Sequence, residues 1–197
     1  MSKSISALIS IAALALACVG GDASAQPHAP ATAQVSVCFV PAQSCRGEIV
    51  AAIDAAKSQI RLQAFKFDVP EIASALVAAR KRGVDIAIIF AIQIERRARK
   101  AACEGTGVDY GVPESVVDAG IPVFVDAQGG KSAHNKVLIV DGELVLGGSY
   151  NYAERVESKN ADNLISIRSK EVASWYLENW QSRQAVSRQL RPLVCKQ

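Results

Sequence analysis

The chain carries the stretch His134-Asn135-Lys136-Val137-Leu138-Ile139-Val140-Asp141, followed by Gly148-Ser149-Tyr150-Asn151, and this stretch predicts a β-hairpin with reactive side chains. His134 and Lys136 are two residues apart, so on an extended segment they point to the same side. The apolar run 137–140 is typical of a strand that is buried on both faces. Asp141-Gly142 indicates a tight turn, and residues 143–146 are expected to form the return strand.

The predicted hairpin would place Gly147-Gly148-Ser149 beside the start of its first strand. Its glycines allow a ligand to approach the backbone closely. An imidazole, an ammonium group, a hydroxyl and an amide then converge on one small volume, and this set suits a phosphate because it offers one nucleophile and several hydrogen-bond donors. The chain has only two histidines, and the other, His28, lies just past a predicted export signal. Histidine chemistry on one chain must therefore use His134.

The pattern H-x-K-x4-D followed by G-S-x-N resembles the phospholipase D superfamily, also called the HKD phosphodiesterases. Four further segments resemble the small secreted bacterial endonucleases of that superfamily, which carry one HKD motif per chain. These segments are residues 52–60, 75–86, 151–152 and 157–163. The similarity covers roughly residues 35–190, which is nearly the whole mature chain. The resemblance implies phosphodiester cleavage on nucleic acid.

Cleavage through a covalent intermediate needs a nucleophile and a proton donor for the leaving oxygen. His134 can fill only one of these roles at a time, so we expect a two-fold homodimer in which His134 of each chain faces one phosphate. The family resemblance implies the same arrangement. One histidine would become a phosphohistidine, and the other would protonate the leaving alcohol.

Further residues are candidates for supporting roles. Lys136 would offset charge on the phosphate oxygens, and Ser149 and Asn151 would add hydrogen-bond donors. The resembling endonucleases use a glutamate to orient the histidine, and Asp162 stands at the matching position. Asp162 is preferred for this role to Asp141, a second candidate whose position in the turn favours a structural role.

Four candidate substrate contacts lie outside this set. Gly148 and Asn163 are expected to touch substrate, although Asn163 can equally turn the chain. Arg96 and Arg97 belong to the basic run 96–100, which either contacts phosphates near the mouth of the cleft or forms a solvated helix face.

The sequence predicts no cofactor and no metal, because the site lacks a carboxylate cluster suited to magnesium or calcium. The preferred function is a non-specific endonuclease on DNA or RNA. A phospholipase D that acts on phosphatidylcholine-type lipids would use the same chemistry, and the motif does not separate the two. A catalytically silent nucleic-acid or lipid-binding module is disfavoured, since binding alone needs no nucleophile.

The N-terminus has the features of a secretory signal peptide. Lys3 precedes the short apolar run 5–19, and Ala23-Ser24-Ala25 fits a cleavage site, so residues 1–25 are expected to be removed. Residues 26–34 would form a flexible leader. An uncleaved anchor and a lipid-modified Cys18 are the alternatives. The protein is therefore expected to be exported, either to the periplasm or to the medium.

Four cysteines remain in the mature chain, an even number that suggests two disulfides in an exported protein. Three pairings are possible. Cys38–Cys45 with Cys103–Cys195 is weakly preferred because the first two are near in sequence, and free buried thiols are the alternative.

The 197 residues, of which 50% are hydrophobic, suffice for one domain at residues 35–197, and the net charge of +3 permits a polyanionic substrate. Strands alternate with helices, which predicts an α/β fold with a mixed sheet sandwiched by helices. Strands are expected at 35–40, 59–67, 84–92, 121–125 and 162–167, besides the hairpin. Helices are expected at 45–57, from Pro70 to Gly83 with Asp68 as a cap, at 113–119 and at 170–191.

Overall fold

The computed structural model describes residues 32–91, 114–126 and 133–190. Within them, one eight-stranded sheet has the order β1-β7-β6-β5-β2-β3-β4-β8. The strands are β1 (Gln34–Phe39), β2 (Gln59–Ala64), β3 (Asp85–Ala91), β4 (Val123–Asp126), β5 (Val137–Val140), β6 (Leu144–Gly148), β7 (Asn163–Arg168) and β8 (Ser187–Gln189). The helices are α1 (Arg46–Ala55), α2 (Pro70–Lys81), α4 (Glu114–Asp118), α5 (Val156–Lys159) and α6 (Lys170–Ala185).

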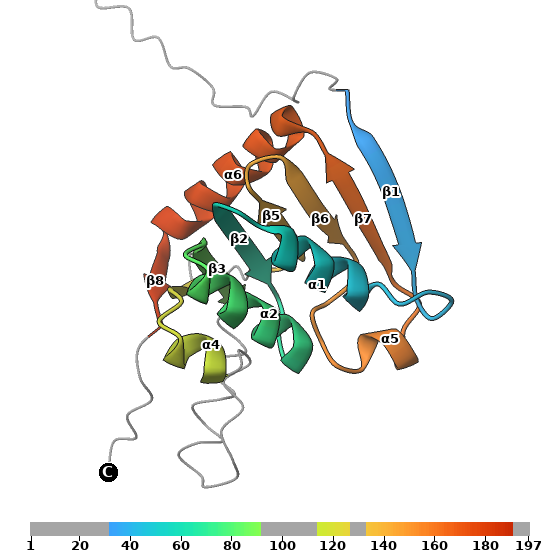
Figure 1. Ribbon diagram of the computed structural model, residues 1–197, viewed down its shortest axis with the longest axis horizontal. Coiled ribbons are helices and arrows are strands. Elements are labelled where there is room, and N and C mark those ends of the chain that lie inside the picture. The colour runs from blue at the N-terminus through green and yellow to red at the C-terminus, as the bar shows by residue number, and fades with distance from the viewer. Residues whose placement is uncertain (1–31, 92–113, 127–132, 191–197) are drawn as a thin grey trace, which may run out of the picture.

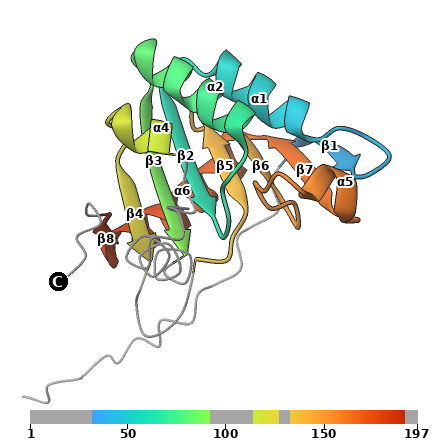
Figure 2. The same cartoon turned by 90° about the horizontal axis from the view of Figure 1, so that it is seen from below.

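The sheet is mixed, as predicted. β2, β3 and β4 run parallel, and the other neighbouring pairs are antiparallel. Helices α1 and α2 cover one face of the sheet and α6 crosses the other, which confirms the predicted sandwich (Figures 1 and 2). No helix among the described residues is long and apolar enough to cross a membrane.

Each face of the sheet buries its own apolar cluster. Ile53 on α1 and Leu76 on α2 belong to the cluster between these helices and the sheet. On the opposite face, Trp180 of α6 packs in a cluster with Ile139 of β5. The Trp180 indole Nε1 donates a hydrogen bond of 3.1 Å to the carbonyl oxygen of Leu62 on β2. Trp180 is therefore a core residue.

Two local predictions are wrong. The last helix ends at Ala185 instead of continuing to Arg191, and the chain then forms β8, which pairs with the edge of β4. Asp68 does not cap α2, because Val69 occupies the N-cap position. The Asp68 carboxylate instead accepts a hydrogen bond of 2.8 Å from the backbone N–H of Glu154.

A disulfide joins Cys38 on β1 to Cys45 at the start of α1, which confirms one bond of the preferred pairing. Cys103 and Cys195 lie outside the described residues, as do Arg96, Arg97 and the predicted signal peptide. The disulfide ties the edge strand of the sheet to the helix layer.

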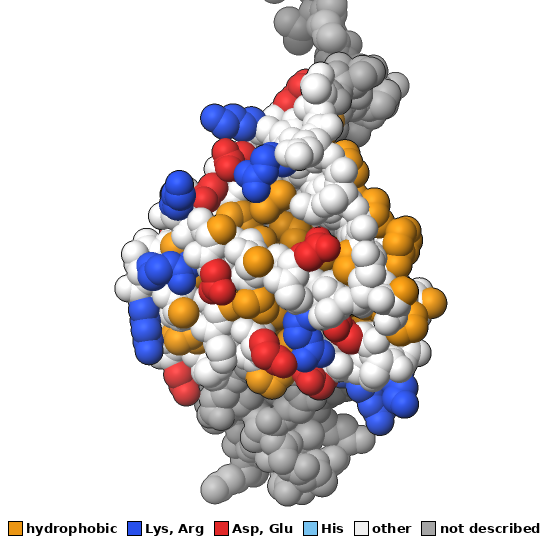
Figure 3. All heavy atoms as spheres, turned by 45° about the vertical axis from the view of Figure 1, so that its right-hand side comes forward, with side chains coloured by type: hydrophobic (Ala, Val, Ile, Leu, Met, Phe, Trp, Pro, Cys, Tyr) orange, Lys and Arg blue, Asp and Glu red, His pale blue; other side chains and the backbone are white. Residues whose placement is uncertain are grey.

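β1 leaves hydrophobic side chains exposed. Cys38 is buried toward α1, whereas Val35, Val37 and Phe39 alternate with it and are 56%, 43% and 56% exposed. These three side chains therefore lie on the α6 side of the strand. The view in Figure 3, which brings the β1 side of the molecule forward, shows hydrophobic side chains at the surface there.

Candidate active site

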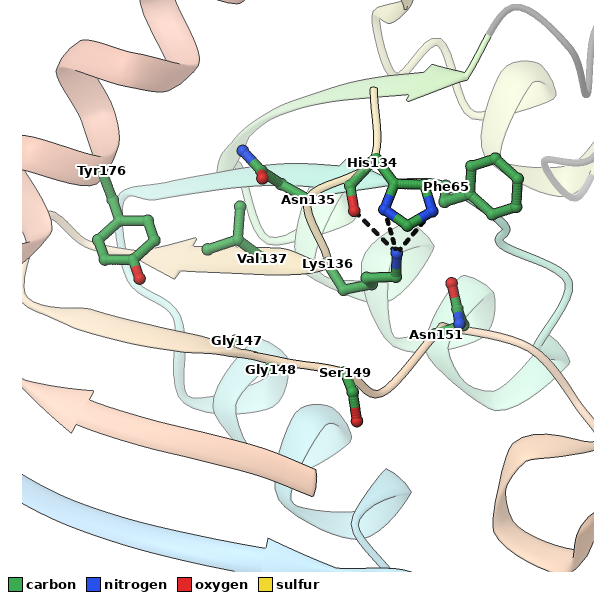
Figure 4. A pocket seen from close by; sticks show the side chains of 10 residues that line it. All are labelled: Phe65, His134, Asn135, Lys136, Val137, Gly147, Gly148, Ser149, Asn151 and Tyr176. Carbon is green, nitrogen blue, oxygen red and sulfur yellow. Dashed lines mark hydrogen bonds between the residues drawn. The ribbon is translucent and has the colours of Figure 1, made fainter. Parts of the chain in front are cut away.

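The predicted reactive side chains line an open pocket of about 580 Å³ at one end of the β5–β6 hairpin (Figure 4). His134 and Lys136 come from the segment before β5, and Ser149 and Asn151 follow β6. Phe65, after β2, and Tyr176, on α6, complete two sides of the pocket.

The hairpin forms as its sequence predicts. Asp141 and Gly142 have φ values of 52° and 65°, and the backbone N–H of Glu143 donates to the carbonyl oxygen of Val140 at 3.1 Å. Positive φ at Asp141 and Gly142 matches the twist of the hairpin, and Glu143 completes the three-residue connection between the paired Val140 and Leu144. The register pairs Val137 with Gly147, so the segment that begins at His134 lies beside the segment that ends β6.

His134 is exposed and is held from two sides. Its ring lies 4.8 Å from the Phe65 ring, between centroids, at a tilt of 53°. The Lys136 Nζ donates to the His134 carbonyl oxygen at 2.8 Å and lies 3.1 Å from Nδ1 of the ring. Because an ammonium group only donates hydrogen bonds, this contact suits a neutral imidazole, the form that can act as a nucleophile.

Lys136 is a half-buried cation in this pocket. Partial burial lowers its pKa from the ordinary value, and the negative charge of Asp162 opposes that shift. Its Nζ also lies 5.4 Å from the centre of the Phe65 ring. The structure therefore brings the ammonium group to the imidazole, as the two-residue spacing predicts.

Asp162 is bonded to residues other than His134. Its Oδ1 accepts a hydrogen bond of 2.6 Å from Ser149 Oγ, and its Oδ2 accepts one of 2.9 Å from Asn160 Nδ2. The backbone N–H of Asn163 donates to Ser149 Oγ at 3.0 Å. In the described part of the chain, no carboxylate is hydrogen-bonded to the His134 ring, so the expected contact from Asp162 is not made within one chain.

Gly148 is required by the neighbouring strand, and its predicted contact with substrate stays a prediction. Its φ is 145°, and a Cβ at this position would lie 2.5 Å from both the backbone oxygen and the Oδ1 of Asn163. Gly147 differs, because a Cβ there would lie 3.4 Å from the carbonyl oxygen of Lys136, an ordinary contact. Gly148 and Asn163 thus pack against each other at the rim of the pocket.

Asp141 lies at the opposite end of β5 from His134. Its carboxylate accepts hydrogen bonds of 2.8–2.9 Å from the backbone N–H groups of Lys57, Ser58 and Gln59 and from Ser58 Oγ. Partial burial raises its pKa, but these hydrogen bonds outweigh it and the net shift is downward. The carboxylate fixes the α1–β2 connection, consistent with the structural role considered for it.

Glu157 organises the segment after β6, a feature that sequence reasoning missed. Its carboxylate accepts hydrogen bonds from the backbone N–H of Arg46 (2.6 Å), from Ser44 Oγ (2.9 Å) and from Tyr150 Oη (3.1 Å). Burial, together with the nearby Glu157 charge, raises the pKa of Tyr150 to about 12. The buried Tyr150 stands between Ser149 and Asn151 and holds both at the pocket.

Asn151 has an unsatisfied acceptor. Its Oδ1 is buried and has no hydrogen-bond partner among the described residues. Figure 4 shows this side chain on the same side of the pocket as Lys136. Within the same ranges, no group of three or more His, Cys, Asp or Glu side chains is placed to hold a metal ion.

Residues 49–183 match the family described as "Cardiolipin synthase, PLD-like domain". The chain is 34% identical to a protein named phospholipase D from Rickettsia prowazekii over 153 residues, which cover 78% of this chain and 69% of the relative. It is 25% identical to the mitochondrial cardiolipin hydrolase of Mus musculus over 145 residues, 73% of this chain and 60% of the relative.

Among solved structures, Nuc from Salmonella typhimurium, described as a phospholipase D family member, superposes with a TM-score of 0.69 at 36% identity. The match covers 81% of this chain and 99% of Nuc. NucT from Helicobacter pylori shares the fold, with a TM-score of 0.66 at 17% identity over 81% of this chain and 100% of NucT. The chain therefore belongs to the phospholipase D superfamily and is a phosphodiesterase hydrolase of that superfamily.

Proposed function

We propose that this phosphodiesterase is an endonuclease that cleaves DNA or RNA without a metal ion, through a phosphohistidine. The observation that supports this most directly is the exposed His134 imidazole, which contacts the Lys136 ammonium group in an open pocket. A nucleophile beside a fixed positive charge is the minimum that attack on a phosphodiester needs.

The reaction would proceed in two displacements. A ring nitrogen of one His134 attacks phosphorus, a P–N bond forms, and the P–O bond to the leaving alcohol breaks. A second, protonated His134 gives its proton to that leaving oxygen. The second histidine then takes a proton from water, the water oxygen attacks phosphorus, and the P–N bond breaks. The products are an alcohol and a phosphomonoester, and both histidines return to their initial states.

The second histidine would come from a second copy of the chain, because the described domain contains His134 alone. Asp162 fits the same arrangement. It is bonded to Ser149 and Asn160 and does not reach His134 of its own chain, so it would accept from the His134 ring of the second copy across a two-fold axis. An acceptor on one ring nitrogen fixes which nitrogen is free to attack.

The other pocket residues would stabilise the pentavalent transition state. Lys136 neutralises developing negative charge on the non-bridging oxygens, and the Asn151 amide and the Ser149 hydroxyl supply further polar contacts. Loss of one such contact costs on the order of 3–4 kcal/mol of transition-state stabilisation. The contacts expected between backbone phosphates and Arg96 and Arg97 stay predictions, since these two residues lie outside the described ones.

A phospholipase D activity is the second candidate, favoured by the 34% identity to Rickettsia proteins of that name. The endonuclease is preferred because the sequence resembles the small secreted bacterial endonucleases of the superfamily over nearly the whole mature chain. We also propose that residues 1–25 direct export, which the Cys38–Cys45 disulfide supports because disulfides persist in oxidising compartments.

The test offers plasmid DNA and phosphatidylcholine vesicles separately to oxidised residues 26–197 in EDTA, with His134→Ala as the matched control. Nicking of plasmid by the wild type alone is the expected result. Choline release without nicking would transfer the assignment to phospholipase D. Nicking that EDTA abolishes would contradict the metal-free mechanism, and nicking by His134→Ala would contradict the phosphohistidine.

A further inference from the structure

We propose that the Cys38–Cys45 disulfide sets the rate of phosphodiester cleavage, because it holds the segments that carry Ser149 and Asn151 into the pocket. The oxidised protein is the fast form and the reduced protein the slow one. This inference rests on the proposed role of the pocket in cleavage, but it does not depend on which phosphodiester is cleaved. Neither cysteine lines the pocket, so the disulfide acts through a chain of contacts.

The Cys38 side of the disulfide borders the backbone that holds Ser149. Val40, two residues after Cys38, donates its backbone N–H to the carbonyl oxygen of Asp162 at 3.0 Å. The Asp162 carboxylate accepts from Ser149 Oγ at 2.6 Å, and the backbone N–H of Asn163 donates to the same Oγ at 3.0 Å. The end of β1 therefore supports the two partners that orient the Ser149 hydroxyl.

The Cys45 side of the disulfide borders the contacts of Glu157. Ser44 Oγ and the backbone N–H of Arg46, the two neighbours of Cys45, donate to the Glu157 carboxylate at 2.9 and 2.6 Å. The same carboxylate accepts from Tyr150 Oη at 3.1 Å. Figure 1 shows α5, which carries Glu157, beside the connection from β1 to α1. Glu157 is therefore a positioning residue, since it joins the disulfide region to the tyrosine between the two pocket side chains.

The disulfide fixes the first turn of α1. In the described stretch 41–48, Cys45 is the only buried residue, and Ile49 is the next buried side chain along the helix. Both cysteines are buried in the core, and two separate thiols need more room than one bonded pair, because non-bonded atoms pack farther apart than bonded ones. Breaking the bond should therefore shift this turn, with Ser44 and Arg46, by about 1 Å.

The rest of the fold does not depend on this bond. The two cysteines are only 7 residues apart in sequence, and a disulfide that closes a short loop stabilises a protein less than one that closes a long loop. Ile49 and Ile53 keep α1 packed in the core, and Asp68 holds the backbone N–H of Glu154 independently at 2.8 Å. Reduction should therefore displace the positioning contacts without unfolding the sheet.

The redox step is thiol–disulfide exchange with a dithiol. The dithiol loses two electrons and two protons and becomes a disulfide, while the Cys38–Cys45 bond breaks and each sulfur gains one electron and one proton. Thiols persist in reducing compartments, and disulfides form and persist in oxidising ones. With the predicted export, the enzyme would be slow in the compartment where the chain is made and fast after it leaves.

The experiment compares the oxidised and reduced forms of one protein. A Cys103→Ala/Cys195→Ala variant of residues 26–197, the parent, keeps Cys38 and Cys45 as its only cysteines. Cleavage of bis(p-nitrophenyl) phosphate is measured in EDTA before and after dithiothreitol, once thiol titration finds two free thiols per chain. Reduction should lower kcat about 10- to 100-fold, because a misplacement of about 1 Å can cost about 100-fold in rate. Reoxidation should restore kcat.

The Michaelis constant separates positioning from a general loss of structure. His134 and Lys136 come from the segment before β5 and are not part of the contacts to the disulfide. They should still bind the phosphate, so KM should stay within about twofold while kcat falls. A loss of active protein by unfolding would be seen in the fluorescence of Trp180, which packs on the opposite face of the sheet.

Glu157→Ala tests whether Glu157 carries the effect. It removes the acceptor of three hydrogen bonds, so the oxidised variant should be about as slow as the reduced parent. Dithiothreitol should then lower its kcat by less than about threefold, because two changes on one path do not multiply. Glu143→Ala is the matched control: this half-exposed glutamate bonds Arg168, far from the disulfide, and its variant should keep the parent's kcat and full response to reduction.

The outcomes separate this proposal from the proposed function. A kcat that reduction leaves unchanged, or losses that multiply in reduced Glu157→Ala, would overturn the proposal and leave the function intact. Exposure of Trp180 on reduction would overturn it too, since the disulfide would then stabilise the whole fold. Cleavage of bis(p-nitrophenyl) phosphate without nicking of plasmid would contradict only the endonuclease. An oxidised parent that cleaves neither substrate would overturn both the proposed function and this link.

Discussion

Replacing Gly148 with alanine is expected to destabilise the protein by about 2–6 kcal/mol. A φ of 145° costs a non-glycine residue about 1–3 kcal/mol. The added Cβ would also lie 2.5 Å from two oxygens of Asn163, and relief of such overpacking costs about 1–3 kcal/mol more. A domain of this kind is stable by only about 5–15 kcal/mol in total, so the change should be large in a urea unfolding curve.

Activity should fall with stability in Gly148→Ala, because the backbone N–H of Asn163 is bonded to Ser149 at the rim of the pocket. Gly147→Ala is the matched control, since its Cβ would meet only an ordinary contact at 3.4 Å. It should stay within about 1 kcal/mol of wild type. Equal unfolding midpoints for the two variants, measured by circular dichroism, would refute the steric reasoning.

Three further predictions concern the charged groups around the site. Asp141→Asn should lower the free energy of unfolding by about 1–2 kcal/mol near neutral pH. Because folding lowers the Asp141 pKa, the difference from wild type in urea unfolding should shrink as pH falls below about 4. A difference that stays constant with pH would contradict the pKa shift. In the proposed mechanism the protonated Lys136 stabilises the transition state, and its pKa is lowered, so the alkaline limb of kcat/KM should fall below pH 10.5. Asp162→Asn should move that limb further down, and an upward move would contradict the effect of this carboxylate on the Lys136 pKa. Glu157→Gln should lower stability by about 1–3 kcal/mol, as thermal unfolding would measure, and an unchanged melting temperature would show that its three hydrogen bonds contribute little.

The hairpin and the alternation of strands and helices could be predicted because local sequence determines them. The apolar run 137–140 forms β5, and Asp141-Gly142 adopts the positive φ values that a tight turn needs. The end of α6 could not be predicted in this way. No glycine or proline follows Ala185 before Pro192, and the chain becomes extended because Arg188 pairs with Val125 on the edge of β4.

The candidate site, too, is predictable only where residues close in sequence determine it. His134 and Lys136 converge because they are two residues apart on an extended segment. Phe65 reaches the His134 ring because β2 pairs with β5, a non-local contact with no local signal. Among the described residues the expected bond from Asp162 to His134 is not made, and the carboxylate accepts from Ser149 and Asn160 instead.

Helix α6 carries both tryptophans of the chain, Trp175 and Trp180. Trp180 is 1% exposed and bonded to the β2 backbone, so its emission should shift to longer wavelength when α6 leaves the sheet. Intrinsic fluorescence is therefore an optical probe of one layer of the sandwich, whereas far-ultraviolet circular dichroism also follows α1 and α2. If the two signals change at the same urea concentration, the two layers melt as a single cooperative unit.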